Sequence, residues 1–327
     1  MGIAAVAWIG LLAGPAGGDD PGALLDRVRK LRLRGELVEA QSTAERGLAS
    51  ERASAADRVR LHLELARIHD RHGLHQNRRP VAAVLDHVEK AEALAGPGAP
   101  ASLKGAIELV KAMHYYRADG AEAHRSAATR HAQEALRLFE QAADGHGAAD
   151  AVHQLGLIHL MRRELGPARE LFDRSLRLDD GAGSRAEFRG DYERHVGFVH
   201  TFAGNGAAAI PCLERSLRHR QEADALDASL FAAEALGAAL VDAGRGPEAR
   251  PLLLQALLLA ERFDSPVGKA RTGMALGRMY EALNDAWSAA LAYEMARRAA
   301  VSVSLDSIAG RARESLGRLA ASARAQP

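Results

Sequence analysis

Cysteine is nearly absent from this sequence, since Cys212 is the only one among 327 residues. An intramolecular disulfide and a zinc site built from several cysteines are therefore excluded, and a small buried thiol is expected at this position. Aromatic residues are also scarce, at 4%, although 47% of the residues are hydrophobic. Strands are usually rich in aromatic and β-branched residues, whereas alanine and leucine favour helices. The composition therefore favours an all-α protein.

An excess of one charge is missing as well. The chain has 43 Lys and Arg against 42 Asp and Glu, which gives a formal net charge of +1. Proteins that bind nucleic acid usually carry a basic excess or patch, so we expect no nucleic-acid partner. The uncharged apolar run at residues 3–12 has ten residues, and a helix that spans a bilayer needs ~20. We therefore expect no membrane span.

The first eighteen residues have the pattern of a secretory signal peptide. The apolar run is followed by small residues and then acid, and Ala16 and Gly18 fit the small-x-small rule for cleavage after Gly18. No Lys or Arg precedes the run, which makes the signal atypical. We expect residues 1–18 to direct export to the periplasm or the extracellular space. A disordered apolar tail on a cytoplasmic protein is the alternative.

A residue pair that ends in glycine recurs at a nearly constant interval. The pairs are Leu155-Gly156, Val196-Gly197, Leu236-Gly237, Leu276-Gly277 and Leu316-Gly317. Their spacing is 41 residues once and 40 residues three times. A turn former, an alanine, a bulky apolar residue and a small residue follow at matched positions, as in Gly244, Ala249, Leu253 and Ala256. Such self-similarity is typical of stacked helical repeats.

Each repeat is predicted to form two antiparallel helices. In one unit, residues 228–243 carry apolar side chains at helical spacing, a glycine turn follows, and Pro247 opens the second helix. Small residues such as Gly237 let the two backbones approach closely. Pro211 and Pro251 share one repeat position beyond the first turn of the second helix. We expect each proline to bend its helix or delay its start.

These features resemble the tetratricopeptide repeat (TPR) family. The fullest match is Leu276, Gly277, Tyr280, Asn284, Ala289, Tyr293 and Ala296. The family's usual spacing is about 34 residues, and the longer spacing here is similar to that of kinesin-light-chain-like TPRs. The resemblance implies a right-handed α-solenoid of antiparallel helix pairs.

The regular repeats cover part of the chain. Residues 148–304 hold four regular units, and residues 305–327 fit a C-terminal capping helix with tail, whose arginines, including Arg311 and Arg318, would face solvent. Residues 19–147 read as less regular TPR-like helices. The chain then has about seven helical pairs in all.

Residues of types that often act in catalysis, metal binding or recognition have structural explanations in this sequence. His62, His69, His72 and His75 crowd one segment, but a zinc site also needs a third ligand and supporting partners. We interpret them as a solvated helix end, with His75 in a loop. Asp191, in an Arg-Gly-Asp tripeptide, is expected at a helix start, where the helix dipole favours it. We assign no catalytic residue, metal or cofactor.

The resemblance also implies a concave groove that holds a peptide or helix of a partner protein. Groove-facing candidates are His153, Gln154, Arg194, His195, Phe198, Phe202, Arg271 and Arg278. Arginine and aromatic side chains together are typical of binding hot spots. The alternative for Phe198 and Phe202 is that they fill the space between units.

The sequence thus predicts a non-catalytic scaffold for protein–protein interaction. A second hypothesis is a regulatory or sensory subunit of a separate enzyme or signalling system, such as a caspase-like protease or a transcriptional regulator. A third is an enzyme whose site lies in the histidine-rich half.

Overall fold

The computed structural model describes residues 20–78, 81–117 and 121–325, and all regular secondary structure within these ranges is α-helical. The helices are α1 (Pro21–Leu33), α2 (Leu37–Ala49), α3 (Ala55–Gln76), α4 (Val81–Ala95), α5 (Ala101–Tyr116), α6 (Glu122–Gln141), α7 (Gly145–Met161), α8 (Leu165–Ala182), α9 (Ala186–Phe202), α10 (Gly206–Glu222), α11 (Leu226–Asp242), α12 (Gly246–Arg262), α13 (Pro266–Ala282), α14 (Ala286–Ser302) and α15 (Asp306–Ala325). This confirms the predicted all-α fold. The predicted signal peptide lies outside the described residues.

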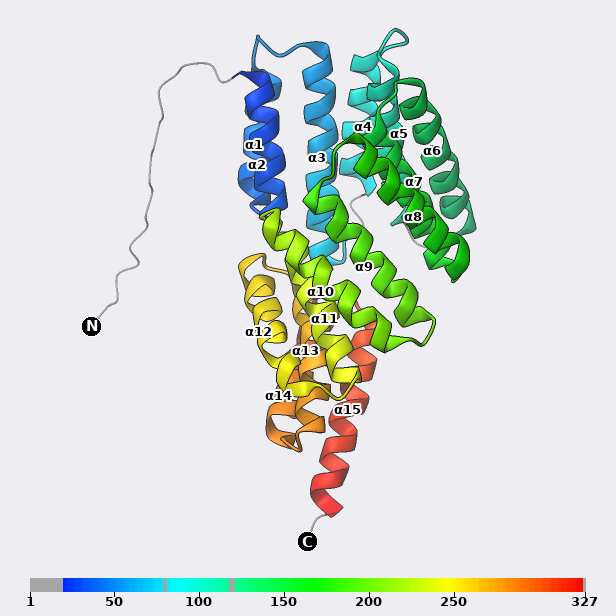
Figure 1. The fold of residues 1–327 in the computed structure, drawn as a ribbon. Helices are drawn as coiled ribbons and strands as arrows, with labels where there is room; N and C mark the ends of the chain where they lie inside the picture. The colour runs from blue at the N-terminus through cyan, green and yellow to red at the C-terminus, as the bar shows by residue number, and fades with distance from the viewer. Residues whose placement is uncertain (1–19, 79–80, 118–120, 326–327) are drawn as a thin grey trace, which may run out of the picture.

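Helices α1 to α14 form seven consecutive pairs of antiparallel neighbours, and α15 packs against α14 (Figure 1). Most of the connections are three residues long, with a left-handed central residue. Gly204, Gly244 and Asn284 hold this position with φ of 76°, 74° and 58°. A left-handed residue ends a helix and reverses the chain, which explains the turn formers of the repeat. Within the described ranges, none of the helices is both long and apolar enough to cross a membrane.

The paired glycines lie where the two helices of a unit approach closely. A Cβ on Gly277 would lie 2.4 Å from the ring of Tyr293, and one on Gly237 would lie 2.6 Å from Leu253. Ala249 and Ala289, the alanines of the same units, are fully buried. The absent side chains make room for a bulky apolar residue of the partner helix. The cores of neighbouring units are continuous, since buried residues of α10 to α14 form one apolar cluster.

The solenoid turns back on itself, so that its first helices meet its last units. Helix α3 packs against α13, and α1 packs against α11. Leu74 of α3 enters an apolar cluster that includes Leu230 and Val267. The Asn77 side chain donates a hydrogen bond of 2.9 Å to the carbonyl of Val303, 226 residues away. The repeat is therefore coiled into one closed turn rather than an open rod.

This closure corrects the interpretation of His75. The residue was expected in a solvated loop, but α3 continues to Gln76 and His75 is 2% exposed. Its Nε2 lies 2.5 Å from a carboxylate oxygen of Asp227 on α11. The contact with α11 supplies both the burial and the polar partner, which local sequence does not reveal.

The two prolines do not delay their helices. Pro211 lies inside α10 and Pro251 inside α12, and each is the sixth residue of a helix that begins at a glycine. Both helices continue for eleven further residues after the proline. A bend at either proline stays a prediction.

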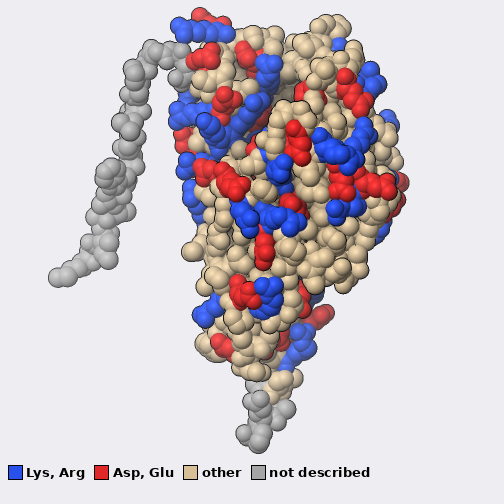
Figure 2. All heavy atoms as spheres, in the orientation of Figure 1, with Lys and Arg blue, Asp and Glu red and all other residues tan. Residues whose placement is uncertain are grey.

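On the face that Figure 2 shows, basic and acidic side chains are interspersed over the upper part of the molecule, and the lower part is mostly uncharged. This distribution agrees with the nearly balanced count of 43 basic and 42 acidic residues.

Candidate partner-binding surface

The residues predicted to face the groove lie on the first helices of the regular units. His153 and Gln154 are on α7, and Arg194, His195, Phe198 and Phe202 are on α9, while α13 holds Arg271 and Arg278. Helix α7 contacts α9, and α11 contacts α13. The structure nevertheless divides these residues into a buried pair, an accessible ladder and one wall of a cavity.

His153 and Gln154 are buried, with exposed fractions of 7% and 5%. A ring nitrogen of His153 lies 2.8 Å from one of His195, and the His153 ring packs against Phe172 and Phe188. Burial lowers the pKa of His153 to about 4 and also lowers the pKa of His195. Both imidazoles are therefore neutral at pH 7. His153 and His195 therefore belong to the packing between α7 and α9.

Accessible side chains on and beside α9 form a ladder of guanidinium and aromatic groups, called here the α9 ladder: Arg194, Phe198 and Phe202 of α9, and Arg163 of the turn between α7 and α8. Arg194 lies over the ring of Phe198 at 4.7 Å, and Arg163 lies over Phe202 at 3.7 Å. The two phenylalanine rings stack with centroids 6.2 Å apart. Phe198 also packs against the cores of neighbouring units, as the alternative interpretation proposed, whereas Phe202 is 39% exposed.

Arg194 is a guanidinium without a carboxylate partner among the described residues. It forms no ion pair with any described residue, and its Nε has no hydrogen-bond partner among them. The neighbouring carboxylates pair elsewhere: Asp191 with Arg220 at 2.6 Å, and Glu234 with Arg271 at 2.7 Å. Burial and the charges of Arg220 and Arg271 lower the pKa of Arg194 to about 9. The arrangement favours an added anion beside Arg194.

The same ion pair corrects the placement of Asp191. The residue was expected at a helix start, but α9 begins at Ala186 and Asp191 is its sixth residue. Its carboxylate binds Arg220, which is 3% exposed, and thereby joins α9 to α10. The Asp191 side chain compensates a buried cation rather than the helix dipole.

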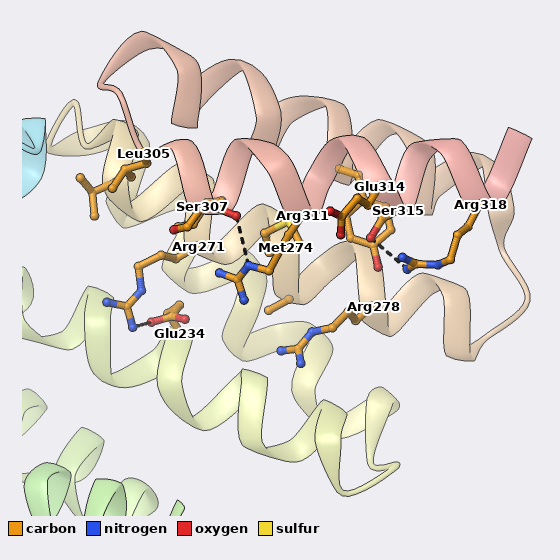
Figure 3. A pocket seen from close by; sticks show the side chains of 14 residues that line it. Glu234, Arg271, Met274, Arg278, Leu305, Ser307, Arg311, Glu314, Ser315 and Arg318 are labelled. Atoms are coloured by element: carbon orange, nitrogen blue, oxygen red, sulfur yellow. Dashed lines mark hydrogen bonds and ion pairs between the residues drawn. The ribbon is translucent and has the colours of Figure 1, made fainter. Parts of the chain in front are cut away.

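A cavity of about 680 Å³ lies between α13 and α15 (Figure 3). Its charged lining residues, which define the arginine cavity, are Arg271, Arg278, Arg311, Arg318, Glu234 and Glu314. Sequence reasoning placed Arg271 and Arg278 on a groove and expected Arg311 and Arg318 on a solvent-exposed side. Both α15 arginines are exposed, as expected, and they also line this cavity. The missed signal is spacing: on α13 and on α15 the two arginines stand seven residues apart, which places them on one helix face.

The histidine-rich segment does not gather a metal-ligand set within the described residues. A ring nitrogen of His62 lies 3.1 Å from one of His87, and His69 stacks on His87. In the described part of the chain, no group of three or more His, Cys, Asp or Glu side chains is placed to hold a metal ion. Cys212 is 5% exposed and free, as the predicted buried thiol.

Comparisons with known proteins identify the fold. No protein-family model matches the chain, and no curated protein sequence matches it. A Rap protein solved with Competence and Sporulation Factor is 15% identical, with a TM-score of 0.63 over 91% of this chain and 85% of that one.

Two further solved structures are similar over most of the chain. NprR in complex with its cognate peptide NprX is 15% identical, with a TM-score of 0.57 over 84% of this chain and 76% of that one. The Rap conjugation gene regulator of plasmid pLS20, in complex with the Phr* peptide, is 13% identical, with a TM-score of 0.56 over 94% and 98%. The chain is therefore similar in fold to these helical-repeat regulators, as a TPR-like solenoid.

Proposed function

We propose that this protein binds a peptide segment of a partner along α9, α11 and α13, and that it acts as a non-catalytic scaffold or regulatory subunit. Two proteins of similar fold are described in complex with peptides, NprX and Phr*. The period of about 40 residues supports the finer placement among long-helix, kinesin-light-chain-like TPRs. Export through residues 1–18 is part of the proposal, and N-terminal sequencing of the secreted protein tests it.

The observation that carries the proposal is the Arg194 guanidinium. The Arg194 side chain is partly buried, its Nε has no described hydrogen-bond partner, it has no described carboxylate partner, and it lies 4.7 Å above the Phe198 ring. A partly buried cation without a partner is unfavourable, so a ligand carboxylate or carbonyl that reaches Arg194 gains a charge-assisted hydrogen bond. Phe202 adds apolar and aromatic area at the end of the same ladder.

Affinity selection from a synthetic octapeptide pool, read by mass spectrometry, tests the proposal. The wild-type protein should retain a defined subset of peptides, and Arg194→Gln combined with Phe202→Ala should reduce retention at least about tenfold. Phe202 is partly exposed and Arg194 forms no ion pair, so the double variant should keep its helical circular dichroism spectrum.

Arg298→Ala is the matched control. Arg298 lies on α14, its side chain is 77% exposed, and its partner is Glu294 of the same helix. This variant should retain the same peptides as the wild type. Equal retention by the double variant and the wild type would show that the peptide binds elsewhere.

A further inference from the structure

The arginine cavity is built from two facing helices. Arg271 and Arg278 come from α13, and Arg311 and Arg318 come from α15. In Figure 3 the Arg311 side chain extends from α15 towards α13, between Arg271 and Arg278. A cavity of about 680 Å³ is within the usual range for a ligand site, ~300–1,000 Å³. It is large enough for the end or the side chains of a peptide.

The cavity carries an excess of positive charge. Four arginines and two glutamates line it, so the formal charge of its walls is +2. Glu234 is already paired with Arg271 at 2.7 Å. Arg278 is paired with Asp242 at 2.6 Å, where the two side chains are 42% and 62% exposed. These pairs leave the two arginines of α15 as the least compensated ones.

Arg311 is the least compensated of the four. Its Nε donates a hydrogen bond of 3.4 Å to the carbonyl of Ser307, and no described carboxylate forms an ion pair with it. Arg318 donates to the Ser315 hydroxyl at 3.0 Å and reaches Glu281 only at 3.8 Å. Guanidinium groups recognise carboxylates through short, charge-assisted hydrogen bonds. The chemistry of the cavity is therefore that of a carboxylate receptor.

Glu314 lines the same wall as Arg311, and Glu234 lies opposite. Both glutamates repel an entering anion and so oppose the four arginines. A peptide supplies carboxylates at its C-terminus and on Asp and Glu side chains, so a carboxylate is the anion that the cavity meets in the proposed complex.

Two charged residues of the arginine cavity also influence the α9 ladder. Arg271 and Glu234, which line the cavity, both act on the charge of Arg194. Arg271 also lies 5.9 Å from the centroid of Phe231, next to the same helices. Glu234 and Arg271 therefore lie close to both the cavity and the α9 ladder.

From these observations we infer that the arginine cavity anchors the bound peptide by a carboxylate, either the chain terminus or an Asp or Glu side chain. The inference rests on the proposed function, because it assigns the cavity to the same peptide. Arg311 is the main anchor, Arg271 and Arg278 support it, and Glu314 limits the affinity by repulsion.

Three synthetic octapeptide pools test the inference by affinity selection. One pool has free C-terminal carboxylates and no Asp or Glu, the second has C-terminal amides with Asp and Glu, and the third has amides without Asp or Glu. The wild-type protein should retain a carboxylate-bearing pool about tenfold more than the third pool. An excess in the first pool identifies the chain terminus as the source, and an excess in the second identifies an acidic side chain.

Arg311→Ala should reduce that excess to less than about twofold and leave retention of the third pool unchanged. Arg313→Ala, an exposed arginine on the same helix that does not line the cavity, should keep the excess. Glu314→Gln should enlarge it, because a repelling charge is removed. Since Arg311 makes one hydrogen bond to the backbone of its own helix, its substitution leaves the fold intact.

The outcomes separate this inference from the proposed function. Equal retention of the three pools by the wild type, or an undiminished carboxylate preference in Arg311→Ala, overturns the carboxylate anchor while peptide binding stands. Retention of none of the pools overturns both.

Discussion

Asp227 of α11 lies 2.5 Å from Nε2 of His75 on α3, across 152 residues of sequence. Arg71, one turn earlier on α3, pairs with the same carboxylate. The Asp227 and His75 side chains are 3% and 2% exposed, and the Phe231 ring stacks on His75 with centroids 5.6 Å apart. This cluster joins α3 to α11 where the solenoid closes on itself.

We predict that Asp227→Ala opens the closure. The substitution leaves the buried His75 and the partly buried Arg71 without their carboxylate, and the loss of one member of a buried ion pair costs about 3–5 kcal/mol. The midpoint of urea unfolding should fall, and amide hydrogen exchange should accelerate in α3 and α11. Asp86→Ala, which removes an exposed partner of Lys90 on α4, should leave both measurements unchanged. Unaltered protection of α3 in Asp227→Ala would mean that apolar packing alone closes the solenoid.

The lowered pKa of Glu64 predicts that the contact between α1 and α3 weakens in acid. Although burial raises the pKa of Glu64, the positive charges of Arg32, Arg67 and Arg29 outweigh it and lower the pKa to about 2. The unfolded value is near 4.5, so the contribution to stability, about 3 kcal/mol, is present above pH ~4.5 and is lost as the pH falls towards 2. Thermal unfolding between pH 7 and pH 3 should therefore show a smaller acid-induced loss in Glu64→Gln. Parallel pH profiles for the variant and the wild type would contradict this assignment.

Alanine substitution should change stability in opposite directions at two of the repeated glycines, Gly277 and Gly317. Gly277→Ala places a methyl group 2.4 Å from the buried ring of Tyr293, and such overpacking costs about 1–3 kcal/mol. Gly317→Ala, at the matched position of α15, meets no atom within 4 Å and should gain up to about 1 kcal/mol from helix propensity. Differential scanning calorimetry of the two variants measures the contrast. A stabilised Gly277→Ala would show that Tyr293 moves aside without loss.

The buried His153, which lies beside His195, predicts a loss of stability below neutral pH. Burial lowers the pKa of His153 to about 4, against 6.5 for an ordinary histidine. The unfolded chain therefore binds more protons between these values, and stability decreases as the pH falls from about 6.5 to 4, by up to about 3 kcal/mol. His153→Gln should flatten the dependence of the melting temperature on pH between 7.5 and 5. An unchanged slope would exclude His153 as its source.

The sequence by itself determined the helical unit. The 40-residue recurrence of Leu236-Gly237, with Gly244 at the turn, is a local pattern, because the two helices of a unit are adjacent in the chain. Steric exclusion explains its glycines: Gly237 lies against Leu253, sixteen residues later. The all-α class and the close helix pairs could therefore be predicted, and the structure confirms the class.

Only the tertiary structure decided which units meet. Small rotations between neighbouring units add up along the solenoid, and no local pattern fixes their sum. This sum brings Asp227 to His75 and buries a histidine that the sequence placed in a loop. It also sets Arg311 of the capping helix opposite Arg271, so that side chains expected on a wetted face line a cavity. Burial and charge compensation depend on these distant neighbours, which is why the sequence pattern could not predict them.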